Sequence, residues 1–88
     1  MKHYKVFIRE FLASWAVALR KSRKLTQEEM AEQLRITSRA YGDLERGKFC
    51  FSAIALLFFM VMLSDEELLS FRNEFRARMS AFEQGEAA

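Results

Sequence analysis

Residues 26–47 read TQEEMAEQLRITSRAYGDLERG and predict two short helices joined by a tight turn. Thr26 and Glu29 form a capping box, because the hydroxyl can accept from one backbone N–H while the carboxylate reaches back to another. The apolar residues that follow fall on one helical face, and they are Met30, Ala31 and Leu34. A first short helix is therefore expected to begin at Thr26.

The turn is predicted at residues 35–37, where the helical spacing of apolar residues is interrupted. Either Thr37 or Ser38 can cap a second helix, which ends at Gly47. Its inward residues are expected to be Ala40, Tyr41 and Leu44. Helices this short are not stable alone, so the rest of the chain must pack against them.

Three further helices are predicted around this pair. Apolar residues recur at steps of three and four along an amphipathic helix from about residue 5 to residue 22. Another helix, over about residues 52–63, is apolar all round, which predicts that it is buried or lies at an oligomer interface. Ser64 and Glu67 form a second capping box that opens a helix over about 65–82. The last six residues, 83–88, are expected to fray.

The composition supports a single all-α domain that spans residues 1–88. The chain has no proline and only three glycines, so long helices are favoured over a sheet with many turns. The net charge is only +2, but the charge is unevenly distributed: residues 1–25 carry +6, residues 26–48 carry −1 and residues 49–88 carry −3. The basic end therefore lies beside the helix pair, which favours local attraction to phosphate over simple solvation of the first helix.

The sequence offers no catalytic or metal-binding set. His3 is the only histidine and Cys50 the only cysteine, so no cluster with metal-ligand spacing exists. A lone thiol and no secretory leader predict a reduced, cytoplasmic protein without cofactors. The apolar run over 53–63 is too short to span a bilayer.

The motif L-T-Q-E-E-x-A-x-x-L at residues 25–34, followed by L-E-R-G-K at residues 44–48, resembles a known family. Segment 19–47 is similar to the helix-turn-helix domain of the lambda-repressor/Cro/XRE family of bacterial and phage DNA-binding proteins. The resemblance implies a five-helix lambda-repressor-like fold. It also implies an ion pair between Arg20 and Glu45 that ties the first helix to the end of the third, a small Ala31 at the helix crossing, and Ile36 as a plug in the turn.

In this family the second helix of the motif lies in the major groove of double-stranded DNA. By position, the resemblance implies that the base-reading residues are Ser38, Arg39, Gly42 and Asp43. It implies that the phosphate-binding residues are Gln27, Thr37, Arg46, Lys48 and Lys24. Arg39 is the leading candidate for reading guanine, because a guanidinium can bond O6 and N7 together.

Three residues depart from the family pattern. Arg35 occupies a turn position where the family often has glycine; if that position requires a positive φ, arginine adopts it at a cost of about 1 kcal/mol. Gly42 removes a side chain from the middle of the recognition helix. Asp43 places a carboxylate there, which can accept from cytosine N4 or repel phosphate.

Two functions are compatible with these residues. The first is a small sequence-specific transcriptional repressor that acts as a homodimer through the helices at 52–63 and 65–82 and the start of the first helix. The alternative is a protein-interaction module, antitoxin-like or an adaptor, that keeps the fold with weak or no DNA binding. Neither function is enzymatic.

Overall fold

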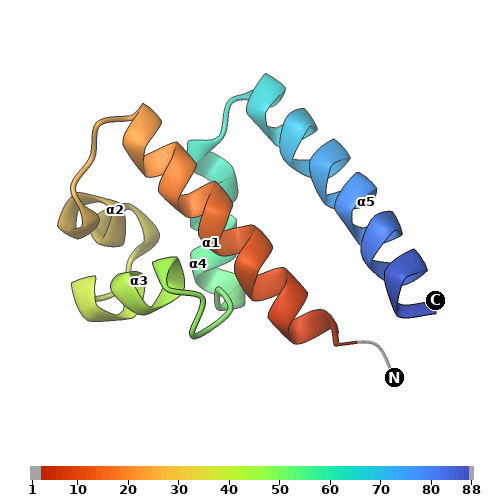
Figure 1. The fold of residues 1–88 in the computed structure, drawn as a ribbon. Helices are drawn as coiled ribbons and strands as arrows, with labels where there is room; N and C mark the ends of the chain where they lie inside the picture. The colour runs from red at the N-terminus through yellow and green to blue at the C-terminus, as the bar shows by residue number, and fades with distance from the viewer. Residues whose placement is uncertain (1–2, 88) are drawn as a thin grey trace.

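The computed structural model describes residues 3–87, which form five α-helices (Figure 1). The helices are α1 (Tyr4–Ser22), α2 (Gln27–Leu34), α3 (Ser38–Glu45), α4 (Ala53–Met62) and α5 (Asp65–Ala87). No strand occurs among the described residues, so the predicted all-α class is confirmed. Figure 1 shows α2 and α3 together on one side of α1 and α5 on the other, with α4 between these two sides.

Side-chain caps begin the three middle helices. Thr26 Oγ1 accepts from the N–H of Glu29 at 3.1 Å, and the carboxylate of Glu29 accepts from the N–H of Thr26 at 2.8 Å, which is the predicted capping box. Thr37, rather than Ser38, caps α3 by accepting from the N–H of Ala40 at 3.1 Å. The hydroxyl of Ser52 caps α4 in the same way. The starts of these helices are therefore set by local sequence.

The core lies where α1, α2, α3 and α4 meet. Tyr41 and Phe59 are fully buried, and Phe11 is 2% exposed. Ala31 is 1% exposed at the point where α2 packs on its neighbours, as expected of a small residue at a helix crossing. Ile36 is half-buried and packs against the same core.

A row of aromatic side chains joins α1 to α5. The rings of Phe7 and Phe82 stack with centroids 4.8 Å apart, and Phe11 meets Phe75 edge-on at 5.2 Å. Trp15 donates from Nε1 to a carboxylate oxygen of Glu74 at 3.1 Å. These contacts cover the start of α1 with α5 of the same chain. The start of α1, one of the three segments predicted to join a dimer, thus packs on α5 within one chain.

The C-terminal helix is longer than predicted. α5 continues to Ala87, past the predicted end near residue 82, so residues 83–87 are helical rather than frayed; residue 88 lies outside the described residues. Two contacts hold this last turn: Tyr4 donates a hydrogen bond to Glu83, and the ring of Phe82 packs on α1. Gly85 costs about 1 kcal/mol in helix propensity, which these contacts offset.

Arg35 ends α2 in the left-handed conformation, so its turn position does require a positive φ. Its φ is 60° and its ψ is 39°. The side chain offsets part of the backbone strain, because its guanidinium lies 4.1 Å above the centroid of the Phe58 ring on α4. Such a cation–π contact contributes about 0.5–1 kcal/mol at an exposed site, comparable with the backbone strain. The arginine therefore ties the turn to α4 where glycine could not.

An ion pair joins the end of α1 to the start of α5. Arg23 Nη2 lies 2.5 Å from Glu67 Oε1, and the guanidinium also donates to the carbonyl of Met62 at 3.1 Å. Glu67 closes the predicted capping box, because it also accepts from the N–H of Ser64 at 2.8 Å. The hydrogen bond from Arg23, followed by that from the Ser64 backbone, lowers the pKa of Glu67 from 4.5 to about 2.

The stability of the fold is expected to depend on this carboxylate in acid. The folded-state pKa of Glu67 lies below its ordinary value, so its contribution is complete above pH 4.5 and is lost as the pH falls toward about 2. Glu67→Gln should therefore lower the free energy of unfolding by about 1 kcal/mol near neutral pH and much less near pH 2. Denaturant titrations of both proteins at the two pH values measure this, with Glu66→Gln as the control at a neighbouring exposed carboxylate. A difference that stays constant with pH would contradict the assignment.

Most of α4 is apolar, and one side of it is not covered. Three residues at spacings of three and four form an exposed stripe, called here the α4 stripe: Ile54 (66% exposed), Leu57 (67%) and Val61 (80%). Among the described residues, no helix has both the length and the apolar character needed to cross a membrane.

Candidate nucleic-acid interface

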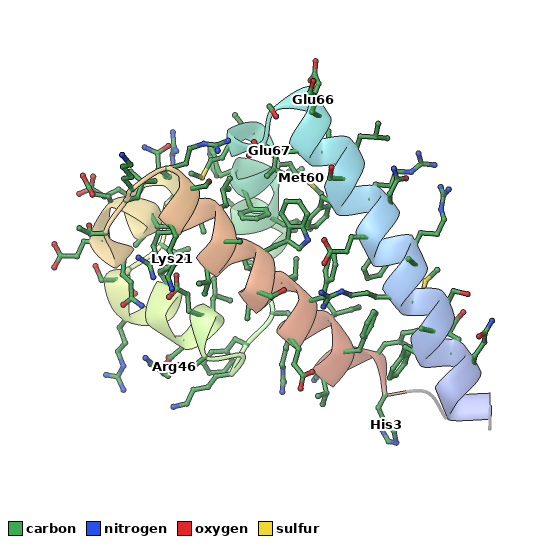
Figure 2. All side chains as sticks on the ribbon, turned by 45° about the horizontal axis from the view of Figure 1, so that its top comes forward. His3, Lys21, Arg46, Met60, Glu66 and Glu67 are labelled. Carbon is green, nitrogen blue, oxygen red and sulfur yellow. The ribbon has the colours of Figure 1, made fainter. Side chains whose placement is uncertain are left out.

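The outer side of α3 carries most of the predicted DNA-contacting residues. Positions 39, 42, 43 and 46 follow helical spacing and share one side, while Tyr41 and Leu44 are buried on the other. We call this side the α3 outer face; it consists of Ser38, Arg39, Gly42, Asp43 and Arg46. Figure 2 shows Arg46 on the side of α3 that is turned away from α5. The fold therefore leaves the α3 outer face open to a partner.

A buried carboxylate fixes the inner side of α3. Glu45, with 8% of its side chain exposed, lies 2.6 Å from Arg20 Nε and 3.2 Å from Arg20 Nη2, so the guanidinium binds it in two places. Tyr41 donates its hydroxyl to Glu45 at 2.5 Å, and Gln27 donates its side-chain amide at 2.8 Å. We call these four residues the Glu45 cluster; they come from α1, α2 and α3.

The electrostatics of the Glu45 cluster are those of a retained ion pair. Burial alone would raise the pKa of Glu45, but the hydrogen bonds from Arg20, Tyr41 and Gln27 outweigh it and leave the pKa below its ordinary value. Burial, together with the bond to Glu45, raises the pKa of the Tyr41 phenol. Glu45 is thus charged and Tyr41 neutral at physiological pH, and α3 is held in one orientation.

The structure changes the roles expected of two polar residues at helix starts. The side-chain amide of Gln27 donates to Glu45, so Gln27 belongs to the Glu45 cluster, and its role as a phosphate contact stays a prediction. The Thr26 hydroxyl accepts from the N–H of Glu29, so the N–H groups of Gln27 and Glu28 are the ones left in the first turn of α2 to bind an anion. The Thr37 hydroxyl accepts from the N–H of Ala40 and can still donate its own proton to a phosphate.

The predicted basic residues differ in how far the fold engages them. Arg39, Lys24 and Lys48 are exposed, and Arg39 makes no hydrogen bond or ion pair within residues 3–87. Arg46 instead pairs with Asp43, which the sequence reasoning did not foresee. Their spacing of three residues on one helix was the signal available for that pair. Arg46 is thus engaged in an ion pair on α3, whereas Arg39, Lys24 and Lys48 are exposed to solvent.

The local geometry is that of a helix-turn-helix: two eight-residue helices, a left-handed residue at the turn and a capped second helix. A comparison with protein families agrees with it, since residues 18–57 match the helix-turn-helix family model, from the last turns of α1 into α4. Residues 18–57 are thus similar to the helix-turn-helix family of the lambda-repressor and XRE kind, and the match supports a DNA-binding transcription regulator. No curated protein and no solved structure matches the chain.

Proposed function

We propose that the protein binds double-stranded DNA sequence-specifically and acts as a small transcriptional repressor in the bacterial cytoplasm, or in that of a phage-infected cell. The observation that carries this proposal is the α3 outer face, which presents guanidinium groups while the Glu45 cluster fixes the opposite side of the helix. In a helix-turn-helix the second helix enters the major groove with its N-terminal residues against base edges. Arg39 is in that position, one residue past the start of α3.

Contacts to the DNA backbone are proposed to position α3. The first turn of α2 offers N–H groups to a phosphate, and the exposed amines of Lys24 and Lys48 lie in the loops that flank the helix pair. Such contacts set orientation without reading sequence, whereas Arg39 can distinguish guanine from the other bases.

DNA binding is expected to weaken steeply as salt rises, because each neutralised phosphate releases counterions. Sites enriched from random duplexes should bind tightly, and Arg39→Ala should reduce the preference at one base position by about 1–3 kcal/mol. Lys48→Ala should weaken all duplexes alike and reduce the salt slope by about 1. Titrations of selected and scrambled duplexes at several salt concentrations measure both. Binding that does not respond to salt would refute the proposal.

We further propose that the protein acts as a homodimer through the α4 stripe and the start of α5. Leu68 and Leu69, at 40% and 56% exposure, add further exposed apolar side chains at the start of the next helix. The start of α1, which the sequence also assigned to the interface, is covered by α5 and is left out of this proposal. A two-fold dimer would place two copies of α3 about 34 Å apart on a palindromic site.

Leu57→Glu is expected to convert a dimer into a monomer, because it places a charge in the centre of the α4 stripe. The matched control is Val6→Glu, which changes an apolar side chain of similar exposure (53%) at the start of α1. Mass in solution and affinity for a palindromic duplex should both fall for Leu57→Glu alone. A wild-type monomer that binds a single half-site would overturn the dimer.

A second candidate function is a protein-interaction module. The observation in its favour is the same exposed α4 stripe, which a different protein can cover as well as a second copy can. It predicts a monomer that binds no duplex at low salt and forms a defined complex with another chain, so the duplex titration separates the two functions.

A further inference from the structure

Gly42 occupies an unusual environment for a residue on an outward helix side. Gly42 is buried, although its neighbours on that side of α3 are exposed or partly exposed. A Cβ atom added at Gly42 would lie 3.3 Å from Nη1 and 3.8 Å from Cζ of Arg46. The guanidinium of Arg46 therefore lies across the backbone at Gly42, in the space that any other side chain would fill.

The backbone itself does not require glycine at this position. Gly42 lies within regular helix and is not among the residues with positive φ, whereas Gly47 is, at 73°. Glycine inside a helix is less favourable than alanine by about 1 kcal/mol. Without a side chain, Gly42 leaves room for the guanidinium of Arg46.

Asp43 holds the guanidinium in that space. Its carboxylate pairs with Nη2 of Arg46 across a spacing of three residues. The carboxylate is largely covered, at 16% side-chain exposure, while the arginine stays 58% exposed. A guanidinium has five N–H donors, so a contact through Nη2 leaves others that can face a partner.

Two consequences follow for recognition. Folding back over Gly42 moves the charged group of Arg46 about one turn toward the N-terminal half of α3, where helices of this kind meet base edges. Pairing with Asp43 also nearly cancels its charge, so Arg46 adds little to the general attraction for phosphate. A guanidinium that is oriented by a carboxylate and carries little net charge is better suited to reading a base than to binding any phosphate.

We infer that Arg46 is a base-reading residue that recognises guanine in the major groove, with Asp43 as its positioning residue and Gly42 as the gap it lies in. This inference rests on the proposed DNA binding. Gly42, Asp43 and Arg46 then act together. Gly42 has no side chain to contact a base, and Arg46, one turn further along α3, makes that contact in its place. Arg39 and Arg46, seven residues apart on the same side, then read two different base pairs of a half-site.

The test compares sites enriched from random duplexes by the wild-type protein and by Arg46→Ala, Asp43→Asn, Gly42→Ala and Gly42→Leu. Arg46→Ala is expected to lose roughly tenfold to hundredfold preference for guanine at one position, with an unchanged salt slope. Gly42→Leu, which displaces the guanidinium, should lose preference at that same position. Gly42→Ala should lose less, because the flexible guanidinium has to move only slightly. Asp43→Asn should lower the preference and steepen the salt dependence, because it frees a positive charge.

Melting temperatures show that the variants are folded, and Arg76→Ala, an exposed arginine on α5, is the control for loss of charge alone. Uniform weakening of all duplexes by Arg46→Ala, with a salt slope lower by about one, would assign Arg46 to phosphate and overturn the inference while leaving DNA binding intact. A wild-type protein that binds no duplex would overturn the proposed function and this inference together.

Discussion

Phe71→Ala is expected to lower the free energy of unfolding by about 3 kcal/mol, within the range for truncating a buried phenylalanine. Phe71 is 9% exposed and is the place where α5 meets the rest of the core. Its ring lies 5.3 Å from that of Phe11, 5.2 Å from that of Trp15 and 6.1 Å from that of Phe59, so it contacts both α1 and α4. Truncation would leave a cavity among three aromatic rings.

The matched control for Phe71→Ala is Asn73→Ala, two residues later on α5, exposed and outside the proposed dimer surface. It should change the stability by no more than about 0.5 kcal/mol. Denaturant titrations followed by tryptophan fluorescence are suited to this, because Trp15 contacts Phe71 directly. Equal effects of the two substitutions would mean that α5, which lies outside the segment matched by the family, is not part of the cooperative fold.

Glu45→Ala is expected to destabilise the protein by about 3 kcal/mol, because it leaves the partners of a largely buried charge unpaired. Arg20 would keep only its bond to the carbonyl of Leu25, at 3.2 Å, and the Tyr41 hydroxyl only a long one to the carbonyl of Ala16, at 3.4 Å. The change also frees the inner side of α3. Affinity for DNA should therefore fall even under conditions where the protein remains folded.

An exposed ion pair on α5 provides the control for Glu45→Ala. Arg78 lies 2.9 Å from Glu74 and is 53% exposed, so Arg78→Ala should cost no more than about 0.5 kcal/mol. A double-mutant cycle on Arg20 and Glu45 isolates the energy of their pair from that of Tyr41 and Gln27. A coupling energy no larger than that of the α5 pair would show that burial does not strengthen the Glu45 cluster.

The helix-turn-helix was predictable because its determinants are local. The capping boxes at Thr26 and Ser64 and the apolar spacing along α2 depend on residues three or four positions apart, which a sequence displays directly. The place of Arg35 in the motif raised the question of a positive φ, and the structure shows that φ is positive there. The ion pair of Arg20 with Glu45 spans 25 residues and was reached only through resemblance to a family.

Features that depend on contacts between distant segments were missed. The end of α5 is stabilised by the first turns of α1, so the sequence around residue 83 alone does not reveal that it is helical. Gln27 carries a side chain that suits phosphate, but its position beside α3 directs it to Glu45. In both cases the competing partner lies far away along the chain.

The departures at Gly42 and Asp43 were visible in the sequence, but their meaning was not. Taken alone, Gly42 indicates weaker DNA binding because a side chain is missing, and Asp43 indicates it because a carboxylate can repel phosphate. The structure places Arg46 against both residues, so the three have to be considered together. The spacing of three residues permits the pair of Asp43 with Arg46, but the rotamer that lays the Arg46 side chain over Gly42 is seen only in the structure.

The division of α3 into a fixed inner side and an open outer face has a consequence for protein engineering. Tyr41, Leu44 and Glu45 make the contacts that hold the helix, and none of them belongs to the α3 outer face. Residues on the outer face can therefore be randomised as a library while the scaffold stays constant, provided that positions 42, 43 and 46 are varied as a linked set. Variants chosen from such a library would differ in the DNA sequence they select and keep the same fold.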